Sequence, residues 1–477
     1  MNELQQHKTA NGSFNGPIAR CVWELTLRCN ALCCFCGSRA GTARAGEFDT
    51  KRCLDLAREM IDLGLEKLTL SGGEPLLSKS FFEIAKFTIA RGVRADTVTN
   101  GLMIDENMAG RIADLGLSAI SISLDGPEEI HDRLRGVPGS YRKVMRGAEF
   151  LDKRGVRVGT ITHVNKINFP HMDRLFEDLK QSAFKIWKVQ LTIPETGCAD
   201  SFRERVTAEQ LPAVADLIRR VQADGRLHCA GGHNIGYFGC EELTLRTRSK
   251  DGPTAWGGCA AGRRVLGMTS NGGVLGCLSL LTHDERFIEG YVTDRSLTEI
   301  WRDPNSFAYN RQFRPEQRSG FCGACRFLER CRGGCINQLA ALDPEMKDNP
   351  LCLYRVESSQ RPPHRTSVRR PPSAVYVVVD GLRPDYIGPG LTPNLHRLMQ
   401  DGMVMNNARS SAVWTMPAVG SMLTGMAAHR LGAIKWASSW RNAKTDLFTF
   451  LANQGYATAS FPFFPKRDVF ARAAGAR

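Results

Sequence analysis

Three closely spaced cysteines, Cys29, Cys33 and Cys36, are the residues of this chain whose types and spacing point most directly to chemistry. They form a CxxxCxxC set in one short loop, so three thiolates can face a common centre. Soft sulfur ligands select zinc, copper(I) or iron–sulfur clusters. A [4Fe–4S] cluster needs four ligands, and three from the protein leave one iron open to a small molecule. A structural zinc loop is the alternative, but it usually shows CxxC pairs, and Cys34 adjoins Cys33 too closely to complete it.

The loop resembles that of radical SAM enzymes, which share this spacing and an aromatic residue before the third cysteine, here Phe35. The resemblance implies a [4Fe–4S] cluster on Cys29, Cys33 and Cys36 whose fourth iron chelates S-adenosylmethionine. It also implies a cellular one-electron reductant, such as flavodoxin or ferredoxin, as a partner.

Short β-rich runs alternate with amphipathic stretches from about residue 19 to 220. The pattern predicts strands at 20–26, 67–71, 94–99, 119–124, 156–162 and 185–193, and helices at 50–63, 81–91, 105–115, 141–153, 169–181 and 208–221. Repeated β-then-α units favour a parallel sheet covered by helices. The fold class is therefore α/β, and the resemblance implies a partial (β/α)6 barrel open on one side.

Glycines and polar residues follow the predicted strands, where the sites of such barrels lie. They are Gly72, Gly73, Glu74 and Pro75 after the second strand, Asn100 after the third, and Ser123 and Asp125 at the end of the fourth. By resemblance, the 72–75 motif receives the amino group of S-adenosylmethionine, the pair at 123 and 125 lies near its ribose, and Phe35 lies near its adenine. Asn100 is a further cofactor-binding candidate, and Arg135 is one for the carboxylate. The alternative is that the glycine-containing motifs are ordinary turns at strand ends and that Arg135 is a surface residue.

A second cysteine block follows the barrel. Its members are Cys259, Cys277, Cys322, Cys325, Cys331, Cys335 and Cys352. Their order and spacing resemble the SPASM extension of radical SAM enzymes, which holds auxiliary iron–sulfur clusters. Eight thiolates would close two [4Fe–4S] clusters, and the motif supplies seven.

The resemblance divides these cysteines between two auxiliary clusters. It assigns Cys322, Cys325, Cys331 and Cys352 to an outer cluster, and Cys259, Cys277 and Cys335 to an inner one. The fourth inner ligand is Cys240, Cys229 or none, in which case an iron stays open to substrate. A zinc ribbon is the alternative. We expect the remaining cysteines, Cys21, Cys34, Cys53 and Cys198, to be small buried hydrophobes.

The tail begins with a linker at 359–373, rich in proline and arginine, that cannot build a core. A β run then ends at Asp380, where a hard metal is often held. From there the chain resembles the N-terminal part of the sulfatase and alkaline-phosphatase superfamily, and Thr415 occupies the position of its nucleophile. Val419 replaces the arginine of the sulfatase signature, and the chain stops at Arg477 without the downstream metal ligands. We therefore expect this segment to be inactive alone, and a Rossmann-like remnant is the competing interpretation.

Composition sets the broad class. The chain has 477 residues, 42% hydrophobic and 23% charged, which is typical of a globular protein of several domains. We predict a flexible N-terminus at 1–17, a radical SAM core at 18–225, a SPASM domain at 226–358, the linker at 359–373 and the incomplete segment at 374–477. No signal peptide or membrane span is visible, and 16 cysteines without one point to metal in a reducing cytoplasm. The net charge of +14 is scattered, and no nucleic-acid motif accompanies it.

The leading functional hypothesis is a radical SAM enzyme that forms a 5′-deoxyadenosyl radical and abstracts hydrogen from a peptide or protein. Sulfatase maturation is an alternative. Two features count against it. The sulfatase-like tail carries Thr415 at the position of the cysteine or serine that such enzymes convert, and Leu278 stands where sulfatase-maturing enzymes carry an aspartate base. A metal-binding scaffold that recognises a peptide without radical chemistry is a third hypothesis, and an ester hydrolase in the tail is a fourth.

Overall fold

The computed structural model divides the chain into two compact units, residues 1–362 and 363–477. In the first unit the structure describes residue 14 and residues 16–193, 205–246, 255–283 and 285–360; in the second it describes 390–392, 394–396 and 421. Several predictions on single residues and segments fall outside these ranges. They concern most of 1–17, Cys198, most of the linker, Asp380, Thr415 and nearly all of the tail.

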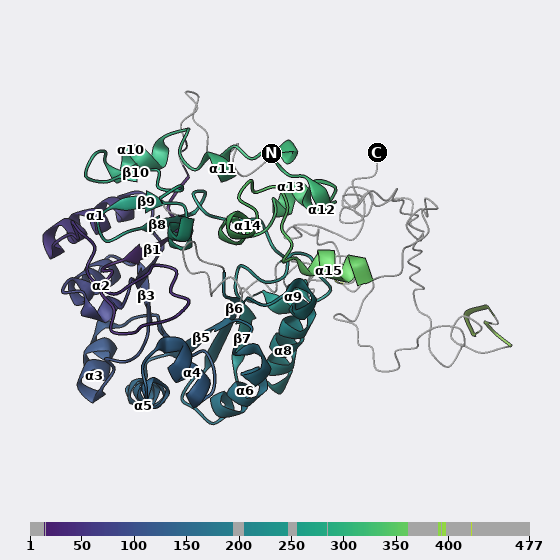
Figure 1. The fold of residues 1–477 in the computed structure, drawn as a ribbon, viewed down its shortest axis with the longest axis horizontal. Coiled ribbons are helices and arrows are strands. Elements are labelled where there is room, and N and C mark those ends of the chain that lie inside the picture. Colours follow the sequence, from purple (N-terminus) through teal and green to yellow (C-terminus); the bar gives the residue numbers. More distant parts are fainter. Residues whose placement is uncertain are drawn as a thin grey trace. The chain divides into compact units, whose positions relative to one another are not determined.

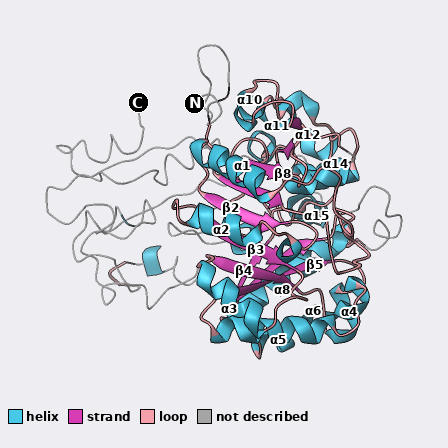
Figure 2. Cartoon of the chain, turned by 90° about the vertical axis from the view of Figure 1, so that its left-hand side faces the viewer, coloured by secondary structure: helices cyan, strands magenta, loops and turns pink. Residues whose placement is uncertain are grey.

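A ten-stranded sheet is the framework of the first unit, in the order β10-β9-β8-β1-β2-β3-β4-β5-β6-β7. Its parallel part consists of β1 (Arg20–Glu24), β2 (Lys67–Ser71), β3 (Arg94–Thr99), β4 (Ala119–Ser123), β5 (Val158–Val164), β6 (Ile186–Leu191) and β7 (His228–Gly231). The strands curve, and the helices lie on their outer side (Figures 1 and 2). This confirms the predicted α/β barrel.

The connecting helices begin and end close to the predicted positions. They are α1 (Thr50–Asp62), α2 (Phe81–Ile89), α3 (Glu106–Leu115), α5 (Ser140–Lys153), α6 (Met172–Lys180) and α8 (Leu211–Asp224), with the short α4 (Glu128–Arg135) unforeseen. Local chemistry fixes their ends. The Asp49 carboxylate accepts a hydrogen bond from the Arg52 amide (2.8 Å) at the start of α1, and Gly116 ends α3 with a φ of +72°.

Alternate residues of each strand face the helices or the barrel interior. On β6, Trp187, Val189 and Leu191 are buried in the main core, and Trp187 stacks on Phe176 of α6 with ring centroids 6.2 Å apart. The intervening residues, including Lys188, face the other side of the strand and are partly exposed. The partly exposed, more polar residues of the strand therefore line the barrel interior.

The cysteine-rich region joins this sheet instead of standing apart from it. Strand β8 (Val265–Met268) pairs in parallel with β1, and β9 (Gly273–Leu275) and β10 (Gly290–Tyr291) follow it antiparallel. Strand β7 also lies beyond the predicted end of the core at residue 225. The short helices of this region are α9 (Glu242–Leu245), α10 (Leu297–Arg302), α11 (Ala308–Arg311), α12 (Gly320–Gly323), α13 (Leu328–Cys331), α14 (Ile336–Leu342) and α15 (Leu353–Gln360), and Cys322 and Cys331 lie on α12 and α13. In the part of the chain that the structure describes, no helix is long and apolar enough to cross a membrane.

Candidate functional site

The cysteine loop follows β1 and is tied down by backbone hydrogen bonds. The Cys29 amide donates to the Gly41 carbonyl (3.0 Å), the Cys34 amide donates to the Leu134 carbonyl (3.2 Å), and the Leu32 amide donates to the Arg135 carbonyl (3.0 Å). The loop is therefore held against the end of α4. Cys29, Cys33 and Cys36 are partly buried.

Each of the three sulfurs receives a hydrogen bond from a different part of the fold. Asn100 Nδ2 lies 3.7 Å from Cys29 Sγ, Arg135 Nη1 lies 3.5 Å from Cys33 Sγ, and the Ala40 backbone amide lies 3.4 Å from Cys36 Sγ. Burial raises the pKa of the Cys29 thiol, and the neighbouring Cys33 and Cys36 raise it further. Three clustered sulfurs with hydrogen-bond donors form a set that fits an iron–sulfur cluster. Cys34, which we expected to be buried, is exposed.

Glu74 lies beside this loop and is fully buried. Its carboxylate accepts hydrogen bonds from Thr99 Oγ1 (2.7 Å), the Asn100 amide (2.8 Å) and the Leu76 amide (3.1 Å). Burial raises the pKa of Glu74 to about 7, against these hydrogen bonds. The carboxylate thus links the ends of β2 and β3.

The two glycines before Glu74 let the motif approach the cysteine loop closely. The Gly73 amide donates to the Thr26 carbonyl (2.8 Å), and the Glu74 amide donates to the Arg28 carbonyl (2.7 Å). A Cβ atom on Gly73 would lie 2.3 Å from the Arg28 carbonyl oxygen, and one on Gly72 would lie 2.4 Å from the Thr26 oxygen. Larger residues at either position would push the two loops apart. Pro75 begins the short 3₁₀ turn that follows.

Asp125 and Arg135 form a buried ion pair next to Cys33. Arg135 Nε donates to Asp125 Oδ2 (2.7 Å), and Arg135 Nη2 pairs with the same oxygen. The other oxygen, Asp125 Oδ1, accepts from the His163 amide (2.8 Å), and the Asp125 amide donates to His131 Nδ1 (3.1 Å). Asp125 is fully buried. The pair therefore positions the guanidinium against the cysteine loop, while Ser123 ends β4 just before it.

Phe35 faces the same corner. Its side chain is buried, its ring centroid lies 5.8 Å from that of His163, and the Arg135 guanidinium lies 5.4 Å from it. His163 Nε2 is 2.6 Å from Gln190 Nε2, and burial lowers the pKa of His163 to about 4. The roles of Phe35, Asn100, Ser123, Asp125 and Arg135 toward S-adenosylmethionine stay predictions, as do those of the 72–75 motif.

A network that sequence reasoning missed holds the cysteine loop from the other side. Glu24 at the end of β1 is fully buried and accepts hydrogen bonds from Arg44 Nε (3.0 Å) and from Ser270 Oγ (3.0 Å). Glu47 accepts from the Leu27 amide (2.7 Å) and from Thr26 Oγ1 (2.9 Å). The one feature of the sequence that could have indicated this network is Glu24 itself, an acidic residue at the end of the first predicted strand.

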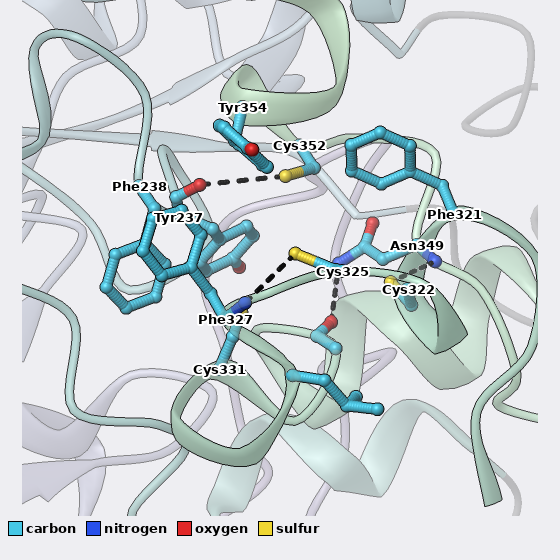
Figure 3. Close-up of a pocket in the computed structure, with 12 residues that line it drawn as sticks. Tyr237, Phe238, Phe321, Cys322, Cys325, Phe327, Cys331, Asn349, Cys352 and Tyr354 are labelled. Atoms are coloured by element: carbon cyan, nitrogen blue, oxygen red, sulfur yellow. Dashed lines mark hydrogen bonds between the residues drawn. The ribbon is translucent and has the colours of Figure 1, made fainter. Parts of the chain in front are cut away.

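The later cysteines fall into two groups. Cys322, Cys325, Cys331 and Cys352 all line one cavity with aromatic walls, as Figure 3 shows. Burial raises the pKa of Cys322 to about 11 and that of Cys352 to about 12, and the neighbouring thiols raise both further. The Asn349 amide donates to Cys322 Sγ (3.4 Å), and the Phe327 amide donates to Cys325 Sγ (3.4 Å). Four thiols around one cavity fit the ligand set of one [4Fe–4S] cluster.

Cys259, Cys277 and Cys335 form the other group. Burial raises the pKa of Cys335 well above its usual value, and the two other thiols add to the effect. The Cys335 amide donates to the Tyr237 hydroxyl (3.0 Å) at the start of α14. Cys229 instead lies in the main core, and Cys240 is exposed, its amide donating to Glu357 (2.8 Å). Neither cysteine is therefore assigned as the fourth ligand of the inner cluster.

Tyr309 on α11 is an unforeseen neighbour of this inner group. Its hydroxyl is buried and has no hydrogen-bond partner among the described residues. Burial raises the pKa of Tyr309 well above its usual value, and Cys259 is the next cause. The adjacent Asn310 donates to the Cys259 carbonyl (2.8 Å), which fixes α11 against the cysteine.

No three side chains of His, Cys, Asp or Glu in the described ranges converge as a site for a single metal ion.

Family comparisons cover all three parts of the chain. The radical SAM superfamily model matches residues 23–179, and the SPASM iron–sulfur cluster-binding domain model matches residues 259–331. A type I phosphodiesterase/nucleotide pyrophosphatase model matches residues 374–449. These matches confirm the radical SAM and SPASM resemblances and the phosphatase-like character of the tail.

Individual relatives agree. The chain is 29% identical to the AdoMet-dependent heme synthase of Oleidesulfovibrio alaskensis over 71% of this chain and 88% of that protein. It is 30% identical to mycofactocin maturase MftC of Mycobacterium ulcerans over 68% of this chain and 84% of that protein. Streptococcus suis SuiB bound to S-adenosylmethionine shares the fold, with a TM-score of 0.57 at 17% identity over 73% of this chain and 78% of that one.

The cofactors implied by these domains are S-adenosylmethionine and [4Fe–4S] clusters, as predicted. The chain belongs to the radical SAM superfamily and carries a SPASM iron–sulfur region after its barrel.

Proposed function

We propose that this radical SAM enzyme modifies a peptide or protein by hydrogen abstraction. When bound, the [4Fe–4S] cluster supplies an electron that cleaves S-adenosylmethionine to methionine and a 5′-deoxyadenosyl radical. The observation that carries the proposal is the grouping of Cys29, Cys33 and Cys36 in one short loop beside Glu74, with a hydrogen-bond donor on each sulfur. The chain's own residues hold the loop, orient the cofactor and exclude water from it.

The peptide substrate is supported by two relatives. MftC is named as a maturase, and SuiB has been solved bound to the precursor peptide SuiA. SuiB shares the fold with this chain, with a TM-score of 0.56 and 17% identity. A protein substrate would reach the radical through the open side of the barrel.

A tetrapyrrole is the second candidate substrate. Relatives named AdoMet-dependent heme synthase, Fe-coproporphyrin III synthase and pre-heme d1 synthase are 28–29% identical to this chain over 69–74% of its length. These names support a tetrapyrrole as the alternative to a peptide.

Formylglycine formation ranks below both. Leu278 occupies the position where sulfatase-maturing relatives carry an aspartate base, and an aliphatic side chain cannot accept a proton.

The proposed ligands follow the three groups of thiols. Cys29, Cys33 and Cys36 would hold the cluster that binds S-adenosylmethionine; Cys322, Cys325, Cys331 and Cys352 would hold the outer auxiliary cluster; and Cys259, Cys277 and Cys335 would hold the inner one. A cellular one-electron donor would reduce the first cluster.

The test is made on protein reconstituted without oxygen. We expect about twelve irons per chain, four for each cluster, and release of 5′-deoxyadenosine after reduction with S-adenosylmethionine present. Changing Cys29, Cys33 and Cys36 together to Ala should remove a third of the iron and all of the product. Cys34→Ala is the matched control, because this exposed residue lies in the same loop and should alter neither.

Tightly held zinc with little iron and no 5′-deoxyadenosine would instead support the metal-binding scaffold and reject the enzyme. A chromogenic phosphate or sulfate ester tests the separate hypothesis for the tail, and product release by the full chain that persists without any cluster would support hydrolase activity there.

A further inference from the structure

Basic side chains gather on the interior face of the barrel. Arg20 on β1, Lys67 on β2 and Lys188 on β6 occupy alternate, partly exposed positions of their strands, opposite the residues buried against the helices. Asp96 on β3 is the acid among them, and Lys67 pairs with it (2.5 Å). One carboxylate therefore faces three cations.

Two of these cations keep unused hydrogen-bonding capacity. The Lys188 ammonium makes no hydrogen bond or ion pair with any residue that the structure describes, and Arg20 Nε is buried without a partner there. Arg20 Nη2 donates to Thr69 Oγ1 (3.3 Å), which fixes the guanidinium in the interior. Buried polar groups are normally paired, so the unpaired Lys188 ammonium and the unused Arg20 Nε suggest an absent anion.

A cavity of about 330 Å³ opens at the N-terminal ends of the strands and reaches Lys188. Its volume is in the range of small-molecule sites. The lining residues include Lys67, Arg94, Arg157, Lys188 and His228, and no acidic residue belongs to the lining. The cavity therefore attracts anions.

The electrostatics of Lys188 agree with this picture. Burial lowers the pKa of Lys188 to about 8, and Arg20 lowers it further, while Asp96 and Cys277 act in the opposite direction. A second anion beside Lys188 would relieve the repulsion between the two cations. Because Cys277 is a proposed ligand of the inner cluster, the site lies on that cluster's side of the barrel.

We propose that Lys188, with Arg20, binds a carboxylate of the substrate inside the barrel, where the interior meets the cationic cavity. The proposal rests on the proposed function and narrows the substrate to one that bears carboxylates. Both a tetrapyrrole and an acidic peptide present that group, so the site defines the chemistry that they share.

The test is equilibrium binding to the reconstituted full-length enzyme without reductant. The probes are coproporphyrin III with its tetramethyl ester, and a labelled hexaglutamate peptide with its hexaglutamine counterpart. We expect at least one acid to bind more tightly than its neutral partner, and the acid that does so identifies the source of the carboxylate.

Substitutions of Lys188 provide the second part of the test. Lys188→Met should weaken binding of that acid tenfold or more, because a charge-assisted hydrogen bond is lost. Lys188→Arg should retain most of the affinity, which excludes a folding defect. Lys185→Met is the matched control, because Lys185 precedes the same strand, is more than half exposed and does not line the cavity.

The proposal is overturned if neither acid binds better than its neutral partner, or if Lys188→Met binds as tightly as wild type. Binding is measured without cofactor cleavage, so failure of the proposed function is seen separately. It would appear as wild-type enzyme that binds the acid through Lys188 yet releases no 5′-deoxyadenosine on reduction.

Discussion

Replacement of Asp125 by Asn is the sharpest test of how the cysteine loop is positioned. The carboxylate is fully buried, and its partner, the Arg135 side chain, is 10% exposed. The substitution keeps an oxygen for the His163 amide but removes the charge that faces the guanidinium. Removing one partner of a buried ion pair costs about 3–5 kcal/mol, because the remaining charge is left uncompensated.

With an unfolding entropy of roughly 2.1 cal/mol/K per residue over the 362 residues of the first unit, a loss of 1 kcal/mol corresponds to about 1.3 °C. The substitution should therefore lower the melting temperature by about 4–7 °C. The assay is anaerobic calorimetry of the reconstituted enzyme, together with iron retained after exposure to a chelator. Arg135 also donates to Cys33 Sγ, so iron should be lost from the first cluster before the auxiliary ones.

Two further variants make this prediction refutable. Adding Arg135→Met to Asp125→Asn should recover part of the lost stability, because the orphaned charge disappears. Glu129→Gln, which breaks the exposed pair with Arg174, should leave the melting temperature near that of wild type. The reasoning is refuted if Asp125→Asn behaves like Glu129→Gln, or if the double variant is less stable than the single one.

Three further predictions concern other parts of the site. Gly73→Ala should abolish S-adenosylmethionine binding in equilibrium dialysis, because its Cβ would lie 2.3 Å from a backbone oxygen, whereas Gly41→Ala, which meets nothing within 4 Å, should bind normally. Burial lowers the pKa of His131 from 6.5 to about 4, so between these values the unfolded chain takes up a proton that the folded chain does not. Stability should therefore fall by about 3 kcal/mol as the pH drops from 6.5 to 4, and calorimetry of His131→Gln should show a weaker dependence. We expect the buried Tyr309 hydroxyl, which has no partner among the described residues, to donate a hydrogen bond to the inner cluster. Tyr309→Phe should then keep the full iron content but lower the reduction potential of that cluster in an EPR-monitored titration, and an unchanged potential would contradict the hydrogen bond.

Short-range spacing made much of the site predictable from the sequence. The cysteines at 29, 33 and 36 and the motif that ends at Glu74 each lie within a few residues and follow predicted strands. The short β-rich runs also placed the barrel strands within a few residues of their observed ends, because β-branched and other apolar residues are enriched in strands.

Long-range contacts and single side-chain orientations were not predictable. Ser270 reaches Glu24 across 246 residues, and no local pattern reports such a pairing. The ion pair of Asp125 depends on α4, a mostly polar helix of only eight residues, which is too short to stand out in the sequence. Cys34 was wrongly expected to be buried, because cysteine usually is, whereas the direction of its side chain is set by the loop around it.

The parallel pairing of β1 with β8 also bears on how the chain is made. Val265 aligns with Arg20, so one edge of the first strand waits for a partner about 245 residues downstream. At a synthesis rate of roughly 5–20 residues per second, that edge stays open for about 10–50 s. An open edge is a template for pairing with another chain. The nascent barrel is therefore exposed to aggregation until the SPASM region leaves the ribosome, and truncation before β8 should yield insoluble protein even though most of the barrel sequence is present.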